Sequence, residues 1–203
     1  MEPARLRIAV IDSGVNPSHP HIARVAGGFP ERDFLDRLGH GTAVMAAIQE
    51  KAPDAEYFAV RVFDRELRTN IDTLVAAIEW CVEHQMDVVN LSLGTANPAH
   101  AARFEPWINR AIFVSAADVY PGKLPGVIRV APDPACPRDQ FRYEADVFYA
   151  SGYPRSIPGV PPEKNLSGAS FAVANMTGFV ARACADLTGR SFESVHSKLK
   201  RCG

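Results

Sequence analysis

The sequence has no long run of charge of one sign and no long hydrophobic run. Its 22 basic and 23 acidic side chains give a formal net charge of -1, which does not favour nucleic acid or an anionic membrane surface as a partner. No apolar stretch approaches the roughly 18 residues of a membrane-spanning helix. Residues 1–11 are too charged, and their apolar part is too short, for a secretory signal peptide. We therefore expect neither a membrane span nor export, and predict a cytoplasmic location.

Cysteine is scarce, and no Cys-x-x-Cys pair occurs. The four cysteines are scattered along the chain at Cys81, Cys136, Cys184 and Cys202. Zinc sites and redox motifs commonly use paired cysteines, so neither is predicted. Because disulfides are rare in the cytosol, we expect reduced thiols.

What the chain does contain is a regular alternation of apolar runs with segments of helical periodicity. Several of the runs are continuous, which is typical of strands buried in a parallel sheet. The alternation predicts an α/β fold in which a doubly wound, mostly parallel sheet carries helices on both faces, with one domain over residues 1–203. The expected strands are residues 6–11, 55–62, 87–93, 111–116, 127–131 and 146–149; the expected helices are residues 42–49, 71–85, 104–110, 170–187 and 191–201; residues 153–162, rich in proline, are expected to be an irregular loop.

Three short motifs supply the groups that a nucleophilic serine site requires. Asp12 ends the first expected strand within Ile-Asp-Ser-Gly, His40 lies in Gly-His-Gly-Thr, and Ser170 lies in Gly-Ala-Ser-Phe-Ala. Sites in an open parallel sheet form where strands end and helices begin, so these residues can converge. We interpret Ser170 as the nucleophile, His40 as its general base and Asp12 as the acceptor that fixes the imidazole tautomer. The chain order Asp, His, Ser is one of three known for such triads.

Each motif alone also has a structural interpretation. Asp-Ser-Gly is common in turns, Gly-His-Gly in loops, and a serine at a helix start as an N-cap. Their combination in one chain favours the catalytic interpretation. His19 and His21 are two candidate metal ligands, but two histidines without a third ligand favour a structural turn. No metal and no cofactor are therefore expected.

The motifs resemble those of the subtilisin family of serine endopeptidases, the subtilases. Further family-like segments follow in the family's order at residues 78–80, 86–94, 120–123 and 167–172. The resemblance implies the subtilisin fold and hydrolysis of peptide bonds through an acyl-enzyme on Ser170. It also implies a peptide or protein substrate in extended conformation, bound by strand addition. Ser92, Leu93 and Gly94 match the stretch that lines the family's first specificity pocket.

In the family an extended substrate pairs between two strand edges. Ser92, Leu93 and Gly94 match one of them, and the other departs from the family pattern. Where many relatives have a Gly-x-Gly run, this chain has Leu67, Arg68 and Thr69. Side chains at these positions are expected to narrow the subsites upstream of the cleaved bond. Arg65 and Arg68 would then favour acidic residues upstream, and the alternative is that both are solvated arginines.

The resemblance places Asp118 where the family has the asparagine of its oxyanion hole, beside the N–H of Ser170. An ionised carboxylate cannot donate a hydrogen bond and repels a negative intermediate. Loss of one such donor costs about 3 kcal/mol, a value whose standard example is subtilisin itself. An active enzyme then has two alternatives. Either an apolar site keeps Asp118 protonated, so that it can donate a hydrogen bond, or other donors stabilise the intermediate. The alternative function is a catalytically impaired homologue that binds an extended peptide.

Several family segments are shortened or missing. The insertion that in the family follows the histidine helix and holds calcium is missing after residues 43–51, so we expect no structural calcium there. The resemblance also leads us to expect no pro-region before the first strand. The compact chain and altered subsites favour a dedicated precursor-processing or leader-peptide-processing protease over bulk degradation.

Overall fold

The computed structural model describes residues 5–31, 33–187 and 189–203. Within these residues, eight strands form one sheet in the order β2-β3-β1-β4-β5-β6-β8-β7. The strands are β1 (Arg7–Asp12), β2 (Gly27–Phe29), β3 (Glu56–Arg61), β4 (Val88–Leu91), β5 (Ile112–Ala116), β6 (Val127–Pro132), β7 (Phe141–Glu144) and β8 (Val147–Ala150). The α-helices are α1 (His40–Gln49), α2 (Ile71–Glu83), α3 (Ala101–Ile108), α4 (Ala169–Ala185) and α5 (Phe192–Cys202), with 3₁₀ turns η1 (Pro98–His100) and η2 (Pro162–Lys164).

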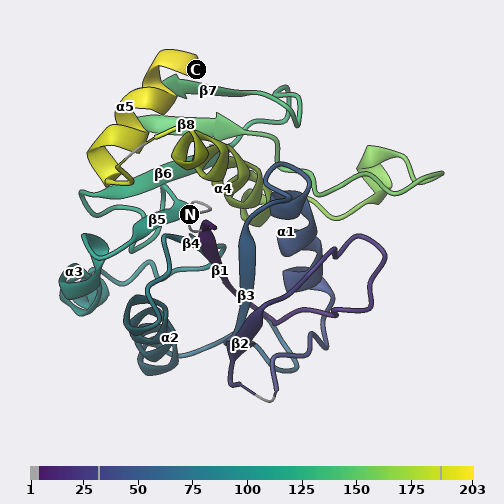
Figure 1. Cartoon of the computed structure of the whole chain (residues 1–203), viewed down its shortest axis with the longest axis horizontal. Coiled ribbons are helices and arrows are strands. Elements are labelled where there is room, and N and C mark those ends of the chain that lie inside the picture. Colours follow the sequence, from purple (N-terminus) through teal and green to yellow (C-terminus); the bar gives the residue numbers. More distant parts are fainter. Residues whose placement is uncertain (1–4, 32, 188) are drawn as a thin grey trace.

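The sheet is parallel except at one edge, where β7 and β8 form an antiparallel pair. Figure 1 shows α2 and α3 on one side of the sheet and α1, α4 and α5 on the other. Alternation along β1 explains this arrangement, because Ile8 and Val10 join the core under α1 and α4, whereas Ala9 and Ile11 join the core under α2 and α3. The fold is therefore the doubly wound α/β fold that the sequence predicts.

All six expected strands and all five expected helices are present, with ends shifted by a few residues. Two strands were not expected. β2 is the three-residue Gly-Gly-Phe segment, which is too short for an apolar run. β7 is Phe-Arg-Tyr-Glu, a half-exposed edge strand whose polar alternate residues break the run. Residues 153–161 form the irregular segment that the prolines predict, and η2 follows it.

α4 is the central helix of the molecule, and most of its length is buried on all sides. Among its buried residues are Phe171, Val173, Ala174, Thr177, Val180 and Ala181. Thr177 differs from the rest, because its hydroxyl donates a hydrogen bond of 2.9 Å to the Asn90 side chain of β4. Helix and strand are thus joined by a polar contact inside an apolar core.

No helix among the described residues is long and apolar enough to cross a membrane. The four cysteines are free, with Cys81 and Cys184 buried and Cys202 exposed. Burial raises the pKa of the Cys184 thiol to about 12, so this thiol stays protonated at neutral pH.

Candidate active site

Asp12, His40 and Ser170 lie at the ends of three different elements. Asp12 is the last residue of β1 and is fully buried, His40 begins α1, and Ser170 lies in the first turn of α4. The His40 ring centroid is 5.4 Å from that of Phe171, so α1 presents its histidine directly beside the start of α4. The converging positions are those expected for a site at the carboxyl ends of parallel strands.

Asp12 and His40 are joined by a short hydrogen bond. His40 Nδ1 lies 2.7 Å from Asp12 Oδ1, and the same oxygen accepts the N–H of Ser13 at 2.7 Å. Asp12 Oδ2 is buried and has no hydrogen-bond partner among the described residues. A carboxylate held in this way favours a proton on Nδ1, which leaves Nε2 free to act as a base.

The environment raises the pKa of His40 above its ordinary value. Burial opposes the charged imidazolium, but the hydrogen bond to Asp12 and the negative charges of Asp12 and Asp36 outweigh it. The imidazole is therefore a stronger base than a solvated histidine.

Ser170 is hydrogen-bonded to Ser92, in the segment that directly follows β4, rather than to His40. Its Oγ donates to the carbonyl of Ser92 at 3.2 Å, and Ser92 Oγ donates to the carbonyl of Ser170 at 3.3 Å. Within the described part of the chain, Ser170 Oγ forms no hydrogen bond with His40. Catalytic hydrogen bonds of free enzymes often tighten only when substrate binds.

The start of α4 also supplies a donor for a negative intermediate. The first N–H groups of a helix have no partner within the helix, and the N–H of Ser170 is among them. Gly168, before the helix, has a φ of 142°, a backbone conformation that side chains rarely adopt. A Cβ built at Gly168 would meet nothing within 4 Å, so the start of the helix is open to a substrate carbonyl.

Asp118 lies in the turn that directly follows β5, and its side chain is exposed. This turn is fixed beside the segment after β4, because Thr95 and Tyr120 exchange backbone hydrogen bonds of 2.9 Å in both directions. Exposure contradicts the expectation that an apolar enclosure keeps Asp118 protonated. Two predictions stay open: other donors carry the oxyanion hole, or the chain is a catalytically impaired homologue that binds an extended peptide.

Comparison with known proteins identifies the family of this chain. The sequence profile of the subtilase family matches residues 4–124 of the chain. The chain belongs to the subtilase family. The matched residues include Asp12 and His40, whereas Ser170 lies beyond them.

Curated subtilases align with most of this chain. The thermostable alkaline protease of Halalkalibacterium halodurans is 31% identical over 86% of this chain and 55% of its own length. Subtilisin E of Bacillus subtilis is 30% identical over 86% of this chain and 52% of its own length. The subtilisin of Bacillus pumilus is 30% identical over the same share of this chain and 72% of its own length. The chain thus spans about half the length of the first two relatives.

A solved structure shows the subtilase fold directly. A cold adapted subtilisin-like serine proteinase superposes with a TM-score of 0.77, covering 96% of this chain and 80% of that chain at 21% identity. At this identity the likeness concerns the fold alone.

In this subtilase the two expected substrate edges lie on opposite sides of Asp12. Ser92, Leu93 and Gly94 directly follow β4, whereas Leu67, Arg68 and Thr69 lie in an exposed loop after β3. Strand β1 runs between β3 and β4, so a peptide crossing the end of β1 would lie between these two edges.

The structure gives little support to the expectation that Arg65 and Arg68 favour acidic substrate residues upstream of the cleaved bond. The side chains of Arg65 and Arg68 are 95% and 83% exposed, and among the described residues each forms one ion pair of 4.0 Å, with a neighbour in the same loop. Charges this exposed contribute little to binding. Their exposure favours the interpretation of two solvated arginines.

The His19–His21 turn is held by a hydrogen bond from its backbone to one of its own imidazole rings. His19 Nδ1 accepts the N–H of His21 at 3.2 Å, and the two rings meet edge to face at 5.1 Å between centroids. Among the described residues, no group of three or more histidine, cysteine, aspartate or glutamate side chains is arranged to hold a metal ion. Both histidines line a cavity of about 300 Å³ beside α1, together with Arg155 and Leu166.

Two polar residues of the site were missed by sequence reasoning. Asp36 lies in the loop before α1 and is half-buried, and Asn90 lies in β4 and is fully buried. No sequence signal pointed to Asp36, because it lies three residues before Gly39, which is the N-cap of α1. An asparagine within an apolar strand, by contrast, is unusual, because a buried amide must be hydrogen-bonded.

Proposed function

We propose that this subtilase is a serine endopeptidase that acts through an acyl-enzyme on Ser170. The observation that carries the proposal is the 2.7 Å hydrogen bond between Asp12 and His40 beside the helix whose first turn holds Ser170. Ser170 Oγ attacks the substrate carbonyl and His40 Nε2 takes its proton. His40 then returns that proton to the leaving amine, and water hydrolyses the ester in the reverse sequence.

The buried Asp12 carboxylate supports the charged intermediate of this reaction. Asp12 Oδ2 has no hydrogen-bond partner in the described part of the chain, and a buried unpaired carboxylate oxygen is costly. Protonation of His40 places a positive charge next to the Asp12 carboxylate. The developing imidazolium is thus stabilised at the step where the proton leaves Ser170.

The proposed substrate is an extended segment of a precursor or leader peptide. Ser92, Leu93 and Gly94 offer one backbone edge at the site, and Leu67 offers a half-exposed apolar side chain on the other. Extended peptides bind such edges through main-chain hydrogen bonds. The cytoplasmic location stays a prediction from the sequence, since it depends on composition alone.

Digestion of an unfolded protein tests the proposal. The protein is incubated with reduced, alkylated casein, and new termini are counted by mass spectrometry beside a Ser170→Ala control. The proposal expects new termini with the native protein and none with the control. New termini at equal rates in both samples would assign the cleavage to a contaminant and contradict the proposal.

Asp118 favours one second candidate, a homologue that binds peptides and cleaves them poorly. An exposed carboxylate at the expected oxyanion position offers no N–H donor to the intermediate. Asp118→Asn restores a donor amide. Because loss of one oxyanion-hole donor lowers kcat by about 10²-fold or more, we expect kcat to rise by up to about 10²-fold. An unchanged kcat would place the hole elsewhere. Peptide binding without cleavage by both proteins would favour the binding homologue.

A further inference from the structure

We infer that Asp36 is a positioning residue that holds the end of β1 and the start of α1 together and turns a second negative charge toward the His40 imidazole. The inference rests on the proposed function, since it concerns how the catalytic pair is kept in place. It assigns to a loop residue a role that depends on charge as well as on shape.

Both carboxylate oxygens of Asp36 are saturated by donors. Oδ1 accepts the hydroxyl of Ser13 at 2.8 Å, the N–H of Leu38 at 2.9 Å and the N–H of Gly39 at 2.8 Å. Oδ2 accepts the N–H of Thr42 at 2.8 Å and its hydroxyl at 2.6 Å. Five donors converge on one half-buried side chain, and only an ionised carboxylate can accept from all of them.

The Ser13 hydroxyl passes the effect of Asp36 to the catalytic pair. Because Ser13 donates its proton to Asp36, its oxygen is free to accept the N–H of Gly41 at 2.9 Å. The N–H of Ser13 donates to Asp12 Oδ1, which contacts His40. A closed ring of hydrogen bonds and peptide links therefore joins Asp12, Ser13, Gly41 and His40. The one rotatable hydroxyl in this ring belongs to Ser13, and Asp36 orients it.

Thr42 repeats the arrangement one position further along. Its hydroxyl donates to Asp36 Oδ2 and accepts the N–H of Asn16 at 3.0 Å. The segment after β1 is thus joined to α1 twice, each time through a hydroxyl whose proton points to Asp36. An asparagine in place of Asp36 would turn a donor amide against these donors and break one of the two links.

The charge of Asp36 is maintained in this setting. Burial opposes ionisation, but the hydrogen bonds from Thr42, Leu38 and Ser13 outweigh it and lower the pKa of Asp36 below its usual range. The carboxylate is therefore ionised whenever His40 titrates. It adds to the negative charge of Asp12 in favouring the imidazolium.

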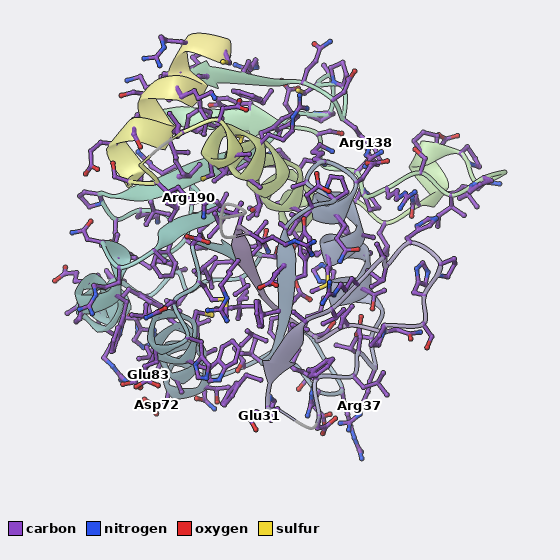
Figure 2. The ribbon with its side chains drawn as sticks, in the orientation of Figure 1. Glu31, Arg37, Asp72, Glu83, Arg138 and Arg190 are labelled. Carbon is purple, nitrogen blue, oxygen red and sulfur yellow. The ribbon has the colours of Figure 1, made fainter. Side chains whose placement is uncertain are left out.

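The negative charge of Asp36 acts on His40, and the other charged groups near Asp36 do not cancel it. Arg37 follows Asp36 in sequence but pairs with Asp33 and Asp64, and Figure 2 shows its side chain at the outer rim of the molecule. Asp12 faces His40 from β1. The other ionisable groups lining the cavity beside Asp36 are His19, His21 and Arg155.

Titration of His40 tests the inference without requiring activity. The imidazole pKa is followed by NMR in a Ser170→Ala background, with Asp36 native or replaced by Asn. We expect Asp36→Asn to move the His40 titration to lower pH, because a negative charge that favours the imidazolium is lost. Asp33→Asn is the matched control, since Asp33 lies in the same loop but pairs with Arg61 and Arg37.

Kinetics in the Ser170 protein completes the test. For Asp36→Asn we expect kcat to fall about 10- to 100-fold with a smaller change in KM, the range caused by displacements of about 1 Å in a catalytic pair. The acid limb of kcat/KM should move to lower pH with the His40 titration. Asp33→Asn should change neither quantity by more than about twofold.

Two results would overturn the inference. One is an unmoved His40 titration together with a kcat equal to that of Asp33→Asn, even if the melting temperature falls. The other result comes from Ser13→Ala, which is the variant to use if Asp36→Asn does not fold. Ser13→Ala keeps the Asp36 charge and removes the hydroxyl that links Asp36 to Gly41. A kcat of Ser13→Ala within twofold of native would contradict the positioning role. Failure of Ser170 to cleave any peptide would instead contradict the proposed function, and the His40 titration alone would then decide the role of Asp36.

Discussion

At the scale of single residues, the glycines on either side of His40 are needed for different reasons. Gly39 has a φ of 81° with open space around its α-carbon, so it is required by its backbone conformation. Gly41 has ordinary backbone angles but no room, because a Cβ there would lie 2.3 Å from the carbonyl oxygen of Gly14. Gly39 turns the chain into α1, and Gly41 lets α1 approach the end of β1.

Gly41→Ala should therefore displace α1 from β1. We expect a loss of about 1–3 kcal/mol in the free energy of unfolding, the usual cost of overpacking, and a fall in peptide cleavage. Urea unfolding measures the first and kcat/KM the second. Gly189→Ala, where a Cβ would meet nothing within 4 Å, is the control and should stay within about 0.5 kcal/mol of native. Equal stability of the two variants would contradict the close approach.

The pH dependence of cleavage is also determined by a single residue, His40. Its base form is the active one, and its pKa is raised by Asp12 and Asp36 against burial. Activity should therefore be lost as pH falls through a value above about 6.5, the ordinary histidine pKa. The measurement is kcat/KM against pH with an uncharged peptide. An acid limb centred below the ordinary value would contradict the raised pKa.

The sequence predicted the catalytic candidates but not their support. Asp12, His40 and Ser170 could be found because their residue types and flanking glycines point to one chemistry. Asp36 could not be assigned, because its role depends on a fold that brings Ser13 and Thr42 to the same carboxylate. The orientation of the Ser170 hydroxyl toward Ser92 was likewise beyond sequence reasoning, since it is a choice of rotamer.

At the scale of elements, α4 and β4 are joined through a short polar chain. Thr177 donates to Asn90 at 2.9 Å, Asn90 donates to Ser92 Oγ at 2.8 Å, and Ser92 contacts Ser170. Thr177 and Asn90 are both fully buried. The start of α4 is thus fixed relative to the strand edge where substrate is proposed to bind.

Thr177→Val tests this connection, since it keeps the shape and removes the donor. We expect a loss of about 1–3 kcal/mol in the free energy of unfolding, because the buried oxygen of Asn90 is left without a partner. Thr177→Ser, which keeps the hydroxyl, is the control. Urea unfolding of both variants is the measurement, and a valine variant at least as stable as the serine variant would contradict the role of the hydrogen bond.

Elements with strong apolar patterns were the predictable ones. The continuous runs of β1, β4 and β5 and the long buried α4 follow from the need of a parallel sheet to be covered on both faces. β2 and β7 were missed because edge strands need little apolar surface. Their pairing is decided by the neighbours β3 and β8.

At the scale of the whole molecule, a buried lysine lies where α1 ends against α4. The Lys51 side chain is only 7% exposed, and its Nζ donates to Asn175 Oδ1 at 2.7 Å. Burial, with the positive charge of Arg138, lowers the pKa of Lys51 to about 8. In Figure 2, Arg138 lies near the same end of α1.

Lys51 should make global stability rise with pH above 8. In the unfolded chain a lysine holds its proton up to about pH 10.4, whereas folded Lys51 releases it near 8. Between these values the unfolded state binds more protons, so the free energy of unfolding increases with pH. Lys51→Met removes this contribution, whereas Lys164→Met, at an exposed site, does not.

Guanidinium unfolding at pH 7, 8.5 and 10 measures this contribution. We expect the stability of the native protein to rise relative to Lys51→Met across the series and to keep a constant offset from Lys164→Met. A constant difference between native and Lys51→Met over this range would contradict the lowered pKa.

Labelling by a fluorophosphonate tests the central claim most directly, because only an activated serine reacts. Intact-mass spectrometry is applied at several pH values to the native protein and to Ser170→Ala and His40→Ala. We predict one label per chain, located on Ser170, dependent on His40 and increasing with pH. Absence of label at every pH, or an equal label on the Ser170→Ala protein, would contradict a nucleophile built from Asp12, His40 and Ser170.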